Sequence, residues 1–349
     1  MDILSMTYDE LSAAFKENSI QSFRSKQVWE WLHKHLARSY DEMLNLPKTL
    51  REELKEKFPI PKCTVERKQV ASDGTVKFLF AVEDDDYIEC VVMKYKYGYT
   101  ICVSSQVGCK MGCAFCASTI GGFKRSLSAG EILSQIYTAQ RELGERISHI
   151  VLMGMGEPMD NFENVMRFIT LVTDEKGLNI SMRNISLSTC GVVPGIKKLM
   201  DKHLQLTLSV SLHAPNNEIR SSLMPVNKRY HIEELLETCL KYEKETSRRI
   251  SFEYSMIAGV NDSDECAREL GTRLKGTLCH VNLIPVNEVD ESPFKPSSPE
   301  RIKRFVEILS KFGVTATVRR KLGSDIDASC GQLRQKRNKE KKGDEGECE

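Results

Sequence analysis

The sequence contains no uninterrupted apolar run close to the length of about 18 residues that a membrane-spanning helix needs. It begins Met1-Asp2-Ile3, without the basic region and apolar stretch that mark a secretory signal. It also shows no disorder-like composition, since 40% of its 349 residues are hydrophobic and 28% are charged. We therefore expect a folded cytoplasmic protein with no membrane partner.

An excess of charge of one sign is absent too, because 50 Lys and Arg residues oppose 49 Asp and Glu residues. A net charge of +1 neither indicates nor excludes a nucleic-acid partner, so any basic surface must be local. The C-terminal tail is locally basic: it contains Arg334, Lys336, Arg337, Lys339, Lys341 and Lys342. Such a tail is either solvated or in contact with RNA, and the sequence leaves both open.

The first 60 residues are predicted to form a helical accessory domain. Val28, Trp31, Leu32 and Leu36 recur at helical spacing. Residues 61–100 then change to strand character, with runs rich in β-branched and aromatic residues at 75–82, 87–96 and 99–105. We expect this segment to be a short β extension between two domains.

Residues 101–312 alternate between strand and helix, which predicts an α/β domain. A capping box, Ser128 to Glu131, opens a helix that extends to about Leu143. About six β/α units follow from the pattern, too few for a closed eight-stranded barrel but suited to an open, curved parallel sheet. Residues 313–349 hold a last strand, a loop ending at Cys330, and the basic tail. In such folds the chemistry lies at the carboxyl ends of the strands.

The twelve cysteines lack the regular spacing of a disulfide scaffold, and most are expected to be buried apolar residues. Cys109, Cys113 and Cys116 differ, because they form a C-x3-C-x2-C motif on a loop with Gly108 and Gly112. Three thiolates suit a [4Fe–4S] cluster in which one iron has no protein ligand. A structural zinc ion is the competing interpretation, but zinc prefers four ligands and no second cysteine pair lies nearby.

The motif and the β/α pattern resemble the radical S-adenosylmethionine (SAM) superfamily, and other motifs resemble its ribosomal RNA adenine-C2 methyltransferases, the RlmN group. The C8-methylating Cfr group is similar. The stretches that carry the resemblance, from the β extension onward, are Ile88-Glu89, Ser104-Ser105-Gln106, Met153-Gly-Met-Gly-Glu-Pro158, Leu187-Ser-Thr189, Ser211-Leu-His-Ala-Pro215, Leu223-Met-Pro225, Val281-Asn-Leu-Ile-Pro285 with Asn287, and Asp325-Ile-Asp327 with Cys330-Gly-Gln332. The resemblance implies a partial (βα)6 barrel with an N-terminal helical domain.

The resemblance also implies roles for single residues. Cys109, Cys113 and Cys116 would hold the cluster, and the iron without a protein ligand would bind SAM. The residues that would line the SAM pocket are Gly156, Glu157, Ser188, Ser211, Leu212, His213 and Asn287. From the residues alone, Glu157 could equally be a helix N-terminal carboxylate, His213 a structural histidine, and Glu89 a surface strand glutamate.

The implied reaction consumes two SAM molecules per turnover. One methylates the Cys330 thiolate; the second yields a 5′-deoxyadenosyl radical that abstracts hydrogen from the new S-methyl group. The resulting radical adds to C2 of adenine, Glu89 takes the C2 proton, and Cys102 releases the product with formation of a Cys102–Cys330 disulfide.

The implied partners are 23S rRNA, modified at adenine 2503, for some members tRNAs modified at adenine 37, and an electron donor such as flavodoxin or ferredoxin. We expect a monomer that contacts RNA through Arg319, Arg320, Lys321 and the N-terminal helical face. Three alternatives stay open: methylation at C8, a radical SAM enzyme for a non-RNA substrate, and a zinc-stabilised RNA-binding module. The residues from Cys116-Ala-Ser-Thr119 to Arg125 favour the C2 group over the C8 group.

Overall fold

The structure is a computed structural model that describes residues 2–286, 293–320, 322–323, 325–326, 333–334 and 337. Two expected site residues, Asn287 and Cys330, lie outside the described residues. So do Lys321 and most of the basic tail. Within the described ranges, no helix is long and apolar enough to cross a membrane.

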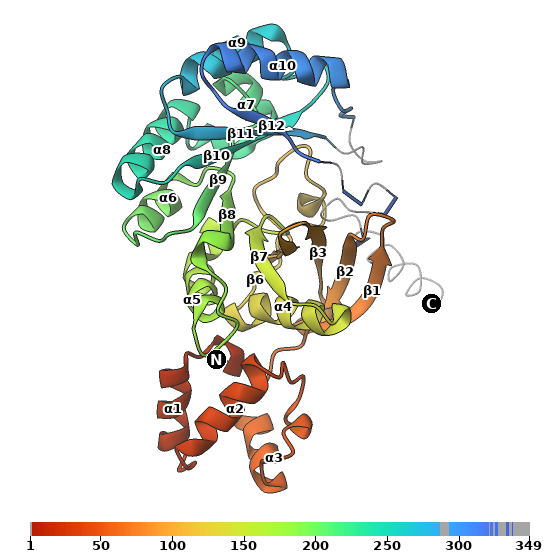
Figure 1. Cartoon of the computed structure of the whole chain (residues 1–349), viewed down its shortest axis with the longest axis vertical. Coiled ribbons are helices and arrows are strands. Elements are labelled where there is room, and N and C mark those ends of the chain that lie inside the picture. Colours follow the sequence, from red (N-terminus) through yellow and green to blue (C-terminus); the bar gives the residue numbers. More distant parts are fainter. Residues whose placement is uncertain are drawn as a thin grey trace.

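The N-terminal residues form a small helical module, as predicted (Figure 1). Its α-helices are α1 (Tyr8–Glu17), α2 (Phe23–His33) and α3 (Lys48–Lys57), with short 3-10 turns η1 (Ile3–Ser5) and η2 (Tyr40–Glu42). Helix α1 begins at a capping box in which Thr7 and Glu10 satisfy each other's backbone amides. Val28, Trp29 and Leu32 of α2 are buried in the hydrophobic core.

A single ten-stranded sheet runs through the rest of the described chain in the order β1-β2-β3-β4-β7-β8-β9-β10-β11-β12. Its first three strands pair antiparallel, and β3 pairs antiparallel with β4. From β4 to β12 every pairing is parallel. The strands are β1 (Thr64–Val70), β2 (Val76–Ala81), β3 (Tyr87–Tyr95), β4 (Gly98–Cys102), β7 (Ile147–Leu152), β8 (Ile185–Thr189), β9 (Thr207–Ser211), β10 (Ile250–Met256), β11 (Cys279–Pro285) and β12 (Ala316–Val318).

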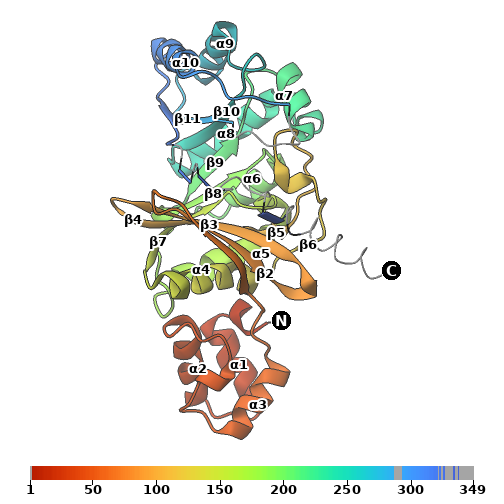
Figure 2. The ribbon, with the colours of Figure 1, turned by 90° about the vertical axis from the view of Figure 1, so that its right-hand side faces the viewer.

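Helices alternate with the parallel strands and cover the outer side of the curved sheet (Figures 1 and 2). They are α4 (Ala129–Leu143), α5 (Phe162–Thr173), α6 (Val193–Met200), α7 (Asn217–Leu223), α8 (Ile232–Thr246), α9 (Asp264–Leu274) and α10 (Pro299–Lys311). The predicted capping box at Ser128 opens α4, and Gly144, with a φ of 66°, ends it in the left-handed conformation.

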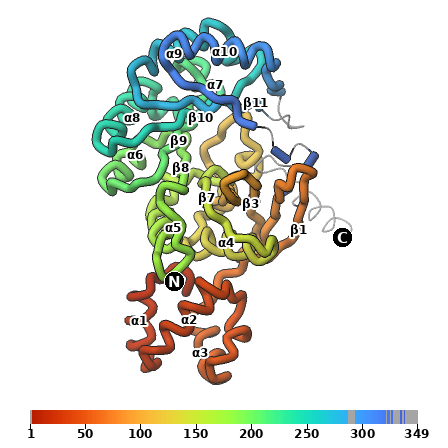
Figure 3. The backbone as a smooth tube through the Cα atoms, viewed as in Figure 1, coloured from red at the N-terminus to blue at the C-terminus, as the bar shows by residue number. Residues whose placement is uncertain are grey.

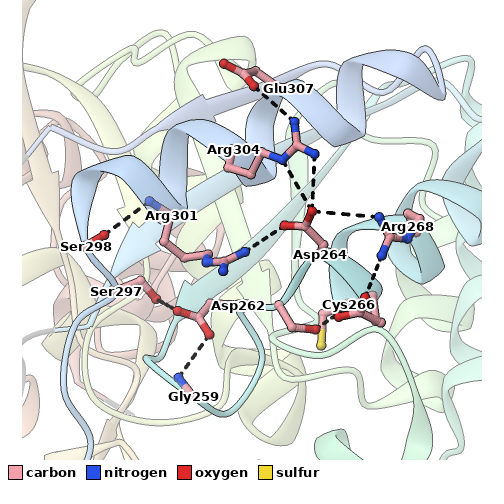
Figure 4. Close-up of polar contacts among 12 residues, drawn as sticks. Gly259, Asp262, Asp264, Cys266, Arg268, Ser297, Ser298, Arg301, Arg304 and Glu307 are labelled. Carbon is pink, nitrogen blue, oxygen red and sulfur yellow. Dashed lines mark hydrogen bonds and ion pairs between the residues drawn. The ribbon is translucent and has the colours of Figure 1, made fainter.

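Helices α9 and α10 are joined by ion pairs around one carboxylate (Figure 4). Asp264 lies 2.7 Å from Nη1 of Arg301 and 3.3 Å from Nε of Arg304. Nη1 of Arg268, on Asp264's own helix, lies 3.8 Å away. The pairs are partly exposed and join two surface helices, and single ion pairs of this kind contribute little to stability.

The α/β class and the mostly parallel sheet confirm the predicted fold. Three details differ from the sequence prediction. The β extension is continuous with the barrel sheet, and β1 and α7 were not anticipated. The last strand joins the parallel sheet beside β11, because Val281 to Leu283 pair with Ala316 to Val318.

Candidate radical SAM site

The three cysteines lie on a loop whose two ends are held together by a small antiparallel sheet. Its strands are β5 (Gln106–Val107) and β6 (Arg125–Ser126). Gly108, at φ 79°, approaches the loop's other arm so closely that a Cβ there would lie 1.8 Å from the Gly122 carbonyl oxygen. Within the loop, the Cys116 amide donates to the Cys113 carbonyl over 3.1 Å. The glycines thus let the loop fold back on itself, as the sequence suggested.

Burial and mutual charge act on the cysteines together. Cys109 is buried, and Cys113 and Cys116 are half-buried. The pKa of Cys109 is raised to about 11, chiefly by burial and in part by the charge of the neighbouring Cys116. Burial, followed by the charges of Cys116 and Cys109, also raises the pKa of Cys113. The thiols are therefore mutual neighbours in a poorly solvated place, where thiolates need a positive group to be stable.

By residue type this donor set suits a [4Fe–4S] cluster, in which three thiolates bind three different irons. It does not form a site for a single metal ion, since no group of three His, Cys, Asp or Glu side chains in the described residues is arranged to hold one.

The glycine-rich turn after β7 packs directly on the start of the cysteine loop. A Cβ on Gly156, whose φ is 102°, would lie 2.6 Å from the Cβ of Gln106. Gln106 Oε1 accepts from the Glu157 amide over 2.9 Å, and its Nε2 donates to Asp160 over 2.9 Å. Gln106 thus bridges the two loops. Its role was not predicted separately, although it ends the Ser104-Ser105-Gln106 stretch.

Glu157 is buried, and both of its carboxylate oxygens accept backbone amides. Oε1 accepts from Met159 over 3.0 Å, and Oε2 accepts from Cys190 over 2.7 Å. Burial raises the pKa of Glu157, and these amides oppose that effect. The carboxylate therefore caps the turn η5 (Pro158–Asn161) and ties it to the end of β8. Each oxygen has a second lone pair that could accept from a ligand.

Ser188, Ser211, Leu212 and His213 lie at or just beyond the carboxyl ends of β8 and β9. Leu212 and His213 are buried, and the two serines are partly exposed. His213 Nδ1 accepts from the Ser255 amide over 2.8 Å, and burial lowers the pKa of His213 to about 3. The imidazole is thus neutral and structurally hydrogen-bonded.

The ring of Phe115, within the cysteine loop, packs edge-on against His213 with centroids 4.8 Å apart. The loop therefore contacts the strand ends that the sequence associated with SAM.

Glu89 is not a surface residue: it is 2% exposed on β3. Its Oε2 lies 2.9 Å from Nζ of the fully buried Lys77, and its Oε1 accepts from the Arg334 amide over 2.7 Å. Arg334 is itself buried, so the interpretation that the tail is solvated is wrong at this residue. Cβ positions built on Gly108 and Gly121 lie 3.2 and 3.3 Å from the Arg334 guanidinium. The segment after the Cys330 loop thus reaches both Glu89 and the cysteine loop.

Cys102 ends β4, where it pairs with Val91 of β3 and Val151 of β7. It is buried in an apolar cluster with Val91 and Met93. Ser104, two residues on, donates to the Glu89 carbonyl over 2.6 Å. The candidate base and the candidate resolving thiol therefore lie on adjacent strands, at the edge that the cysteine loop follows. No disulfide links cysteines within the described residues.

Known proteins match this chain over nearly its whole length. Residues 103–270 match the radical SAM superfamily, and residues 1–60 match the ribosomal RNA large subunit methyltransferase N-terminal domain. A probable dual-specificity RNA methyltransferase RlmN of Clostridium novyi is 52% identical over 334 residues, covering 95% of this chain and 97% of the relative. The Clostridium tetani RlmN is 53% identical over 337 residues, or 96% of each chain. The chain belongs to the RlmN family.

A solved structure of a radical SAM methyltransferase agrees with this assignment. The crystal structure of a radical SAM methyltransferase from Sphaerobacter thermophilus superposes with a TM-score of 0.92 at 46% identity, covering 95% of this chain and 98% of that one. Membership of the radical SAM superfamily implies a [4Fe–4S] cluster and SAM as cofactors. Both the predicted fold and the predicted family are thereby confirmed.

Proposed function

We propose that this protein methylates C2 of adenine in RNA, at adenine 2503 of 23S rRNA and at adenine 37 of tRNAs, through an S-methylcysteine at Cys330. The observation that carries the proposal is the near-full-length similarity to RlmN proteins. We further propose a cytoplasmic monomer that uses a flavodoxin or ferredoxin as electron donor.

Cys109, Cys113 and Cys116 would hold the cluster, which supplies the reductive cleavage of SAM to a 5′-deoxyadenosyl radical. Gly156, Glu157, Ser188, Ser211, Leu212, His213 and Asn287 would bind SAM. The packing of Phe115 on His213 and of Gln106 on Gly156 supports this assignment, since both contacts join the cysteine loop to these residues. Two SAM molecules would be consumed per turnover.

Glu89 would remove the C2 proton of the adenine. A carboxylate that acts as a base must be ionised before the proton moves. The Lys77 ammonium lies 2.9 Å from Oε2 of Glu89 and the Arg334 amide donates to Oε1 over 2.7 Å, so both carboxylate oxygens have a defined partner. Arg334 lies four positions after the methyl carrier Cys330 in the sequence, so its bond to Glu89 supports a site shared by the two residues.

Cys102 would resolve the covalent RNA–protein intermediate by attacking the Cys330 sulfur, which leaves a disulfide for an external thiol to reduce. Its position two residues before Ser104, which bonds to the Glu89 backbone, supports this role.

The test is anaerobic reconstitution of the cluster, incubation with SAM, reductant and a 23S rRNA fragment or tRNA, and mass spectrometry of the digested RNA. We expect 2-methyladenosine from the wild type and none from Cys109→Ala or Cys330→Ala. Cys266→Ala, a buried cysteine on α9, is the matched control and should retain activity. Cys102→Ala should accumulate an RNA–protein adduct on a denaturing gel.

Three other outcomes of this experiment would each contradict a different part of the proposal. If 8-methyladenosine dominates, the family stands and the C2 assignment is wrong. If an intact cluster cleaves SAM but no RNA is methylated, the RNA substrate is wrong. If the purified protein contains zinc and no iron, the cluster assignment is wrong.

A further inference from the structure

Arg220 of α7 is a completely buried cation whose described hydrogen-bond partners are all uncharged. Its guanidinium donates to the carbonyls of Leu212 over 3.2 Å, Cys190 over 2.7 Å and Ser211 over 3.2 Å. Its Nη1 donates to Asn227 Oδ1 over 3.0 Å. No ion pair joins Arg220 to a carboxylate within the described residues. A buried charge without a counter-charge is costly, so the position calls for a negative partner from elsewhere.

The cysteine loop is the neighbour that can supply such a partner. The Ala114 amide donates to the Leu223 carbonyl, at the end of α7, over 2.9 Å. The side chain of Cys113 packs with Leu223 and Met224 in one apolar cluster. Cys190, whose carbonyl accepts from the Arg220 guanidinium over 2.7 Å, belongs to the same cluster. A fixed positive charge, that of Arg220, thus lies near Cys113, one ligand of the proposed cluster.

We propose that Arg220 sets the reduction potential of the cluster by stabilising its reduced state, an inference that rests on the cluster assignment in the proposed function. Reduction moves one electron from the external donor to the cluster, and no proton transfer is required. The added negative charge stays inside the protein, where a nearby cation interacts with it far more strongly than in water. The described hydrogen bonds of Arg220 do not include Cys109, Cys113 or Cys116, so it is a positioning and electrostatic residue rather than a ligand of the cluster.

The test is a redox titration of the reconstituted protein followed by electron paramagnetic resonance. Arg220→Gln removes the charge and should lower the midpoint potential. At the wild-type midpoint we expect the ratio of reduced to oxidised cluster to fall about tenfold, which corresponds to about 59 mV for a one-electron couple. Arg220→Lys keeps the charge and loses the guanidinium hydrogen bonds. In this variant the ratio of reduced to oxidised cluster should stay within about twofold of the wild type.

A second variant covers the case in which Arg220→Gln does not fold. Asn227→Asp retains Arg220 and is isosteric, and it places a carboxylate on the guanidinium contact that now measures 3.0 Å. The new negative charge cancels the field of Arg220, so the potential should fall in the same direction as in Arg220→Gln. Asn227 also donates to Ser221 over 2.8 Å. Asn227→Ser loses that contact and those with Arg220 and Asn217 without adding charge, so it is the matched control and should leave the potential unchanged.

Two results would overturn the inference: a wild-type potential in both Arg220→Gln and Asn227→Asp, or an equal loss in Arg220→Lys and Arg220→Gln. The second result would mean that Arg220 acts through geometry alone. If Arg220→Gln fails to assemble a cluster, the Asn227→Asp and Asn227→Ser pair decides. None of these readouts requires RNA. A wild type that holds a cluster but methylates nothing would therefore refute the substrate proposal and leave this inference standing.

Discussion

Lys77 and Glu89 form an ion pair of 2.9 Å between adjacent strands, and both side chains are almost completely shielded from water. Removing one partner of such a pair leaves a buried charge uncompensated, which costs roughly 3–5 kcal/mol. We therefore expect Lys77→Met to lower the free energy of unfolding by about that amount in urea unfolding followed by circular dichroism.

The control for this prediction is the double variant Lys77→Met with Glu89→Gln. Because it removes both charges, it should recover much of the lost stability. The single variant Glu89→Gln completes the double-mutant cycle, and the loss in the double variant minus the sum of the two single losses gives the coupling energy. Single losses that add up to the loss in the double variant would show that the pair is not coupled in the folded protein.

The cysteine motif is local, so its spacing alone is enough to predict cluster ligands, and the reconstitution experiment above tests that prediction. The burial of Glu89 and its partner Lys77 could not be predicted, since β2 is buried on both faces and shows no alternation. Arg220 was missed for the same reason: its partners come from the ends of β8 and β9 and from η7 (Pro225–Lys228), and only the fold brings them together.

At the scale of elements, helix α4 is tied to the return strand of the cysteine loop. Glu131 completes the capping box by accepting from the Ser128 amide over 2.9 Å. The same carboxylate holds Arg125 of β6 through two bonds of 2.8 Å. Charge-assisted bidentate bonds of this kind are stronger than neutral hydrogen bonds. One buried side chain thus fixes both the start of α4 and the end of the loop.

We expect Glu131→Ala to lower the free energy of unfolding by about 2–3 kcal/mol, because it removes half of the capping box and leaves Arg125 with a weaker partner. Ser128→Ala, which removes only a cap, should cost about 1 kcal/mol. Urea unfolding measures both. The exposed pair Glu237 and Lys241 is the comparison: Glu237→Ala should leave the unfolding midpoint unchanged. A loss in Glu131→Ala no larger than in Ser128→Ala would show that the link to β6 contributes nothing.

The elements that sequence patterns predicted are the long amphipathic ones. Helix α4, with its cap and fifteen residues, was found within one residue of its observed ends. Helix α7 has seven residues and a mixed sequence, so its period cannot be recognised. Strand β1 was missed because its side chains alternate between exposed and half-buried positions and none is fully buried.

At the scale of the whole molecule, the helical module sits against α4 and α5 (Figure 3). Ser5 Oγ accepts from the Gly130 amide over 2.8 Å, and Arg167 reaches Glu10 over 2.6 Å. Trp29 Nε1 donates to the Lys176 carbonyl over 2.9 Å. The module is therefore docked on the barrel through specific polar contacts as well as through the shared hydrophobic core.

His33 lies in this junction and makes the docking measurable by pH. Its Nδ1 lies 2.5 Å from the Tyr137 hydroxyl of α4, and burial lowers its pKa from 6.5 to about 3. Below about pH 6.5, the pKa of an unfolded histidine, His33 binds a proton in the unfolded chain but not in the folded chain. Stability is therefore greatest above about pH 6.5 and is lost as the pH falls toward 3.

We expect this histidine to remove about 1.4 kcal/mol of stability between about pH 7.5 and about pH 5.5. His33→Phe lacks this linkage, so the stability difference between wild type and variant should shrink by that amount on acidification. Taking the difference cancels the contributions of His213, Glu157 and Glu253, which are the same in both proteins. Tyr137→Phe, which keeps His33 buried, should lower stability equally at both pH values. A difference between wild type and His33→Phe that does not change with pH would mean that His33 is accessible to protons and that the module does not dock on α4 as described.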